Sequence, residues 1–114
     1  MPEEARLMDH LYIKVGGEEL PAGAMDDLVE VSVDSNLHYP DMFTICLHDE
    51  RLEWISTDLF GLGKEVEIAT VPDEGGRSTT LIKGEITALE PDFSAGTQAI
   101  LQVRGYDRFK HFSL

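Results

Sequence analysis

Hydrophobic residues recur at every second position along most of this chain. Such alternation predicts β-strands, because successive side chains of a strand point to opposite faces of the sheet. The clearest example runs from Leu28 to Leu37, where Val29, Val31 and Val33 are expected to point inward between polar neighbours. The same pattern predicts strands over these further segments: residues 11–15, 18–20, 42–48, 64–71, 79–89 and 97–106.

The connections between these strands are rich in Gly, Pro and Asp. Residues 49–63 break the alternation and predict one short helix or an irregular packed connection, which ends at Gly61 and Gly63. Chain reversals are predicted at three places: Gly16-Gly17, residues 72–78 and residues 91–96. Strands at roughly ten-residue spacing joined by such turns indicate an all-β fold, an antiparallel barrel or sandwich, with one short helix.

Length and composition indicate a single folded domain. The chain has 114 residues, of which 42% are hydrophobic, which is enough for one core and too few residues for two domains. We expect one domain over residues 1–114, with residues 1–10 as a disordered leading segment. The lone cysteine, Cys46, has no second cysteine for an intrachain disulfide, so a reducing compartment is the simplest interpretation.

The charge balance excludes several classes of partner. The chain has 9 Lys and Arg against 22 Asp and Glu, a formal net charge of −13. Since nucleic-acid binding depends on clusters of Lys and Arg near phosphates, sequence-specific DNA or RNA binding is not expected. No apolar run approaches the roughly 20 residues that a membrane helix needs, so we expect no membrane insertion by this segment.

Candidate catalytic and metal-binding residues are few. Cys46 and His48 lie two apart on a predicted strand and point the same way, yet a structural zinc site needs about four ligands. The other histidines are at positions 10, 38 and 111 and have no ligand spacing. The acidic pairs Glu18-Glu19 and Asp26-Asp27 read as solvated surface. No motif of a nucleophile, phosphate loop or metalloprotease is present, so we predict no enzyme activity, no metal and no cofactor.

Five stretches of the chain, taken together, resemble a known family. The five stretches follow one another in the same order as in that family: residues 11–20, 31–43, 63–68, 84–91 and 103–108. Over about Leu11 to Arg108 the chain resembles the phage late control D and VgrG-like hub proteins. In the last stretch the matching motif is Gly105-Tyr106-Asp107-Arg108. Family members usually continue with Ser or Thr, His, Arg and Leu, whereas this chain continues with Phe109-Lys110-His111-Phe112.

The resemblance implies a structural role without catalysis. In that family the region is the first antiparallel β-barrel of a longer baseplate hub, which forms homotrimers and adapts a sixfold tail tube to a threefold spike. The implied partners are tail tube and spike proteins. The implied location is a phage tail or an injection-system particle assembled in the bacterial cytoplasm.

The residues of the motif also allow an interpretation of their own. Gly105 on a regular strand suggests a bulge or a close backbone approach, and Tyr106 a half-buried ring. Asp107 and Arg108 would form a charged corner that leaves the barrel. We expect all four to be structural residues.

Two further hypotheses follow from the sequence. Asp26, Asp27, Glu30 and Asp34 are hypothesised to line the bore of a ring and to repel acidic cargo, with plain solubility as the alternative. The alternative to a hub function is a small β-barrel that binds a ligand in its interior or a peptide along an open edge strand.

Overall fold

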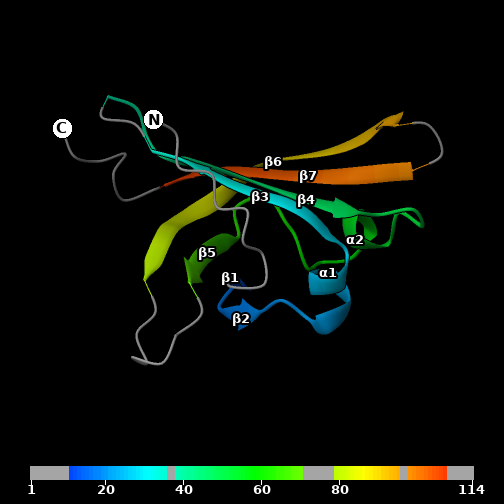
Figure 1. Cartoon of the computed structure of the whole chain (residues 1–114), viewed down its shortest axis with the longest axis horizontal. Coiled ribbons are helices and arrows are strands. Elements are labelled where there is room, and N and C mark those ends of the chain that lie inside the picture. Colours follow the sequence, from blue (N-terminus) through cyan, green and yellow to red (C-terminus); the bar gives the residue numbers. More distant parts are fainter. Residues whose placement is uncertain (1–10, 36–37, 71–78, 96–97, 108–114) are drawn as a thin grey trace.

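The protein is a strongly curled antiparallel β-sheet. The computed structural model describes residues 11–35, 38–70, 79–95 and 98–107. Seven strands lie in the order β2-β1-β5-β6-β7-β4-β3 and form a half-barrel (Figure 1). The all-β fold class predicted from the sequence is therefore confirmed. The elements are β1 (Leu11–Val15), β2 (Glu18–Glu19), α1 (Ala22–Asp26), β3 (Leu28–Asp34), β4 (Met42–His48), α2 (Glu53–Ser56), β5 (Glu65–Thr70), β6 (Thr80–Ala95) and β7 (Gln98–Asp107).

The core lies on the inner face of the curl, where the alternating apolar residues meet. In β4 the side chains of Phe43, Ile45 and Leu47 are fully buried, as the alternation predicted. Leu101 and Val103 of β7 lie beside Leu47 and Ile45 in the ladder and are buried too. The inward residues of β1, β5 and β6 complete the core from the other half of the sheet: Leu11, Ile13, Val15, Val66, Ile68, Ile82 and Ile86.

Strand β6 connects the two halves of the sheet. Its first part, up to Glu85, pairs with β5, and its part from Gly84 onward pairs with β7. The sequence predicted a reversal over residues 91–96, and this prediction was wrong, because Pro91 to Ala95 continue β6. Proline has no N–H to donate and is tolerated only where a strand has an unpaired side. Pro91 lies beyond the last residue of β6 that pairs with β5, so among the described strands only β7 pairs with it.

The described residues contain two short helices, where the sequence predicted one. Helix α1 was missed because it has only five residues, includes Gly23 and has no side-chain cap. Helix α2 falls within the predicted segment but ends at Ser56, well before the glycines expected to stop it. Within the described residues, no helix is long and apolar enough to cross a membrane.

One side chain of β3 points away from its predicted face. Val29 was expected inward with Val31 and Val33, but it is 37% exposed. A register shift between Leu28 and Glu30 explains this difference, because a β-bulge turns the extra residue out of the alternation. Three of the sequence-based expectations concern residues outside the described ranges: disorder of residues 1–10, the hairpin tip over 72–78, and the corner at Arg108.

Candidate functional site

The segments that carry the family resemblance meet at one end of the sheet. Gly105 of β7 lies between Phe43 of β4 and Ile86 of β6. The Ile86 N–H donates to the Lys64 carbonyl oxygen at 2.9 Å, and the Gly63 N–H donates to the Ile86 carbonyl oxygen at 2.8 Å. Four of the five stretches are thus joined by one set of backbone contacts.

The fifth stretch joins the same network through β1. The Gly16 N–H donates to the Glu65 carbonyl oxygen at 2.8 Å, directly after the Gly63-Lys64 turn. On the opposite side, the Asp107 N–H donates to the Asp41 carbonyl oxygen at 2.8 Å. We call this region the motif corner and define it as residues 16, 41–43, 63–65, 84–86 and 105–107.

Two glycines of the motif corner lie where no side chain fits. A Cβ atom at Gly105 would overlap the carbonyl oxygen of Glu85 and the ring of Phe43, which is fully buried. A Cβ atom at Gly84 would overlap the backbone carbonyl of Tyr106. Gly105 therefore makes the close backbone approach that its place on a regular strand suggested.

The remaining motif residues lie at the rim of this corner. Tyr106 is 45% exposed and pairs in register with Met42 and Glu85. Asp107 is half-buried and pairs with Gly84. These contacts hold the end of β7 against the beginning of β4 and an inner part of β6.

A second candidate site is a pocket at the other end of the sheet, beside the two helices. It has a volume of about 360 Å³ and is lined by Asp27, His48, Asp49, Glu50, Arg51, Glu53 and Trp54. Asp49 is 3% exposed, and its two carboxylate oxygens accept from the backbone N–H groups of Trp54 at 2.8 Å and Ile55 at 3.0 Å. Asp49 therefore satisfies two donors at the beginning of α2 that lack partners within the helix.

Trp54 joins α2 to α1. Its indole Nε1 donates to the Asp27 carboxylate at 2.8 Å. Its ring packs against Gly23, where an added Cβ atom would lie 3.5 Å from the nearest ring carbon. The Asp27 carbonyl oxygen also accepts from the His48 N–H at 2.8 Å. Asp27 and Asp49 are consequently occupied in holding the helices to the sheet. Sequence reasoning missed this pairing, since Asp27 and Trp54 are 27 positions apart.

His48 also lines this pocket. Its Nδ1 is buried and makes no hydrogen bond with any described residue. Cys46 and His48 lie on the same face of β4, as predicted, but no group of three potential metal ligands occurs among the described residues. The geometry therefore offers a polar pocket at α1 and α2, in which the two buried or half-buried carboxylates already have donors.

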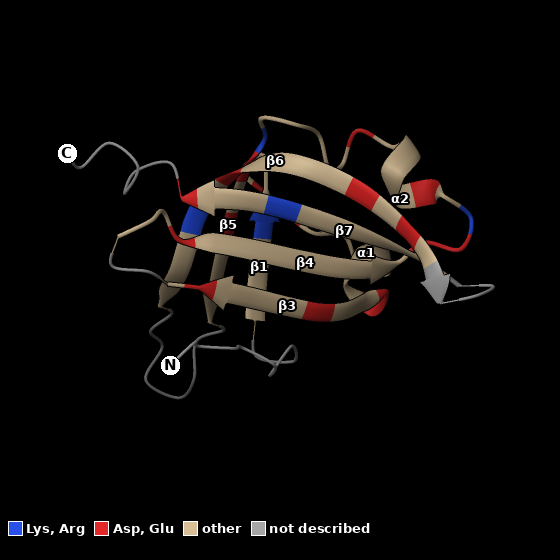
Figure 2. Cartoon of the chain, turned by 90° about the horizontal axis from the view of Figure 1, so that it is seen from above, with Lys and Arg blue, Asp and Glu red and all other residues tan. Residues whose placement is uncertain are grey.

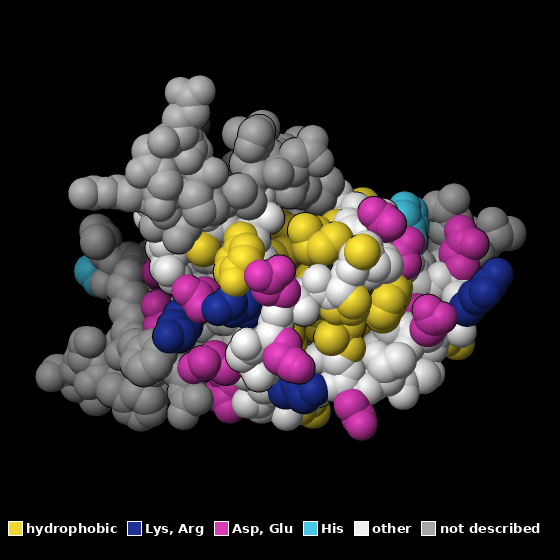
Figure 3. Space-filling view, turned by 90° about the horizontal axis from the view of Figure 1, so that it is seen from below, with side chains coloured by type: hydrophobic (Ala, Val, Ile, Leu, Met, Phe, Trp, Pro, Cys, Tyr) yellow, Lys and Arg dark blue, Asp and Glu magenta, His cyan; other side chains and the backbone are white. Residues whose placement is uncertain are grey.

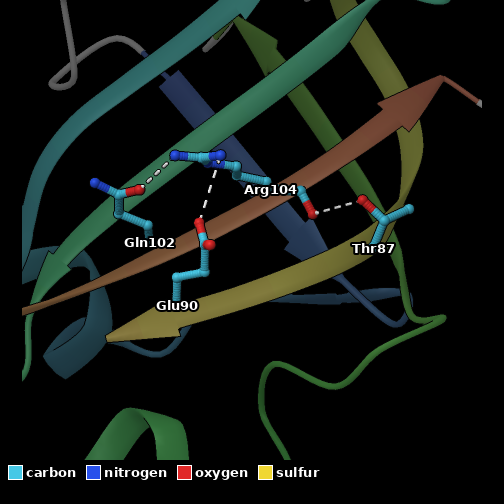
Figure 4. A network of polar contacts seen from close by, with 4 residues as sticks. All are labelled: Thr87, Glu90, Gln102 and Arg104. Carbon is cyan, nitrogen blue, oxygen red and sulfur yellow. Dashed lines mark hydrogen bonds and ion pairs between the residues drawn. The ribbon is translucent and has the colours of Figure 1, made fainter. Parts of the chain in front are cut away.

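The outer face of the sheet carries a polar network around Arg104 (Figure 4). The Arg104 guanidinium lies 3.4 Å from the Glu90 carboxylate and donates to the Gln102 side-chain oxygen at 2.9 Å. The Thr87 hydroxyl donates to the Arg104 carbonyl oxygen at 3.5 Å. The Arg104 and Glu90 side chains are exposed, so their ion pair contributes at most about 1 kcal/mol to stability.

Cys46 lies on this outer face, between Glu30 of β3 and Gln102 of β7 in the ladder. Burial raises the pKa of the Cys46 thiol above its ordinary value of 9.0, and the Glu30 carboxylate raises it further, while Arg104 lowers it. The thiol therefore stays protonated near neutral pH, which is the unreactive form of cysteine.

The acidic residues proposed to line a bore fall in two places. Glu30 and Asp34 are exposed on β3 (Figure 2), and Asp26 is exposed at the end of α1. Asp27 differs from them, because it is half-buried and bonded to Trp54. The pair Glu18-Glu19 is exposed in β2, which fits its expected place on the surface.

Comparison with protein-family models finds no family that matches this chain, and comparison with characterised proteins finds no match either.

Proposed function

We propose that this chain is a structural β-barrel module of a baseplate hub, in a phage tail or another contractile injection system. In this function it adapts a sixfold tail tube to a threefold spike as part of a homotrimer of a longer protein. It acts through its shape and its surfaces, without catalysis.

One observation carries this proposal. The five stretches that resemble the hub family are far apart in the sequence, but they come together in the motif corner through strand pairing and backbone hydrogen bonds. Residues that this chain shares with the family for a common structural reason are expected to lie close together in space. The antiparallel half-barrel also agrees with the barrel that the resemblance implies.

The surface supports a role in assembly. Hydrophobic side chains gather in the middle of the underside, and acidic and basic side chains lie beside them (Figure 3). A contiguous apolar area with a polar rim is typical of protein interfaces. The large exposed apolar residues include Tyr39 and Leu62, each 69% exposed.

The test is to locate the chain in assembled particles. An epitope tag on the protein in its native host, followed by particle purification and antibody labelling in electron microscopy, should place it at the junction of tube and spike. Mass spectrometry of the same particles should give three copies per particle. A tagged protein that never copurifies with particles and stays monomeric would contradict the hub function.

The pocket favours a second candidate, a small-molecule binding module. Its volume of about 360 Å³ falls within the range of ligand pockets, and Trp54 offers an aromatic wall. Its carboxylates would favour a cationic ligand. Screening cationic metabolites by quenching of Trp54 fluorescence tests this candidate. The Glu50→Gln variant, which removes an exposed carboxylate from the pocket lining, should then bind them more weakly.

A further inference from the structure

Strand β3 is an edge strand of the sheet, and no described strand pairs with one side of its backbone. Among the described residues it pairs with β4 alone, and the ladder is regular from Glu30 to Asp34 after the bulge at Val29. An edge strand presents a row of N–H and C=O groups that another extended chain can pair with. The β3 edge is therefore a place where a further strand fits.

The side chains along this edge alternate in a defined way. Val31 and Val33 are 1% and 5% exposed on the inner face. Glu30 and Asp34 are exposed, and the half-buried Ser32 lies between them. Side chains directly opposite each other on neighbouring strands have Cβ atoms about 4.5–5.5 Å apart. An added strand would thus place one side chain against each carboxylate.

The charges on the two edge strands, β2 and β3, oppose edge-to-edge pairing between copies of this chain. The other end strand, β2, consists of Glu18 and Glu19, both exposed. A contact of β3 with β2 or with a second β3 would set carboxylates against carboxylates, in a chain of net charge −13. Like charges on opposite strands destabilise a pair, whereas Lys or Arg opposite a carboxylate stabilises it.

We propose that the β3 edge binds an extended segment of a partner protein with Lys or Arg at two positions four residues apart. These two basic side chains lie against Glu30 and Asp34, and the residues beside Val31 and Val33 are apolar. The partner motif is therefore basic, apolar, any residue, apolar, basic. This inference adds a partner contact to the assembly function and does not depend on it, because the test uses the isolated chain.

The test uses fluorescein-labelled peptides that contain Lys-Val-Thr-Val-Lys or, as the charge-reversed control, Glu-Val-Thr-Val-Glu. Fluorescence anisotropy with the full 114-residue chain should give saturable binding of the basic peptide only. Raising the ionic strength should weaken this binding, because exposed charges are screened. Hydrogen exchange should slow at the amides of β3 when the basic peptide is bound.

Matched double variants test the assignment to β3. Glu30→Lys/Asp34→Lys should lose affinity for the basic peptide by about tenfold or more and gain affinity for the acidic one. Glu18→Lys/Glu19→Lys changes the net charge by the same amount, but on β2, the opposite edge strand. It should leave the affinity for the basic peptide within about twofold of the original value. Circular dichroism confirms that each variant is folded.

Three results would overturn the proposal. Equal loss of affinity in both double variants would mean general attraction to an acidic protein. Unchanged binding of a basic peptide N-methylated at alternate residues would mean that no backbone ladder forms. Absence of saturable binding of the basic peptide would mean that the edge does not accept a basic strand.

Discussion

A single methyl group at position 105 has no room. In the Gly105→Ala variant the added carbon meets the Glu85 carbonyl oxygen and the buried Phe43 ring, so strands must shift apart. We expect a loss of about 1–3 kcal/mol in the free energy of unfolding, measured by urea denaturation. Gly61→Ala is the matched control, because its Cβ would lie 3.6 Å from the Lys64 side chain, and it should change stability by less than about 0.5 kcal/mol. Equal stabilities of the two variants would contradict this account.

Asp49 anchors α2 through two hydrogen bonds from backbone N–H groups. Asp49→Ala leaves both donors without their acceptor and should cost about 1–3 kcal/mol, with Asp49→Asn intermediate because one oxygen remains. Trp54 is the only tryptophan, so its emission should shift to longer wavelength as α2 loosens. Asp58→Ala, at an exposed position, is the control, and a comparable shift there would refute the anchoring role.

The Cys46 thiol should show a raised pKa in its reaction with iodoacetamide. The rate as a function of pH should have its midpoint above 9.0, since burial and Glu30 both disfavour the thiolate. Glu30→Gln should lower that midpoint, and Arg104→Gln should raise it. The folded state holds the thiol proton more tightly than the unfolded state, so this contribution to stability is present below pH 9.0 and is lost as pH rises above it. A midpoint below 9.0 would be inconsistent with this environment.

Residue-level features were predictable only where the signal was local. The close approach at Gly105 could be expected because a glycine interrupts an otherwise regular strand, and the shared face of Cys46 and His48 follows from their spacing. The bond between Asp27 and Trp54 had no such signal, because it depends on how α1 and α2 meet across 27 positions. Asp49 contacts residues only five and six positions later, but its anchoring role was hidden because the four-residue α2 shows no helical period that would mark where it begins.

At the scale of elements, β3 provides a matched pair of tests. Val31→Asp puts an unpaired carboxylate into the core and should cost several kcal/mol in thermal or urea unfolding. Val29→Asp, two residues earlier, lies at the bulge on an exposed position and should cost about 1 kcal/mol or less. If the two variants were equally stable, the register shift between Leu28 and Glu30 would be misplaced.

Strand alternation predicted most of the sheet, and the failures have physical causes. The inward faces of β1, β4 and β7 were predicted because Leu11, Phe43 and Leu101 belong to unbroken alternating runs. Pro91 was taken as a turn residue, since the sequence does not show that β5 pairs only with the first part of β6. A five-residue helix such as α1 is too short to display a helical period.

At the scale of the whole molecule, charge should limit stability. With a net charge of −13, mutual repulsion favours the expanded chain, and salt screens it. The Debye length falls from about 30 Å at 0.01 M to about 8 Å at 0.15 M ionic strength, so we expect Tm to rise by several degrees over this range. The triple variant Glu18→Gln/Glu19→Gln/Glu50→Gln should show a smaller rise. A Tm that falls with added salt would show that attractive pairs dominate instead.

The sheet order also has a consequence for synthesis on the ribosome. Strand β1 must wait for β5, some fifty positions later, and the hairpin of β3 and β4 must wait for β7 before its inner flank is paired. Nascent chains lacking Gln98–Asp107 expose unpaired strand flanks, which is the condition that recruits chaperones and invites aggregation. Any truncation that removes β7 should therefore yield an insoluble product rather than a smaller folded one.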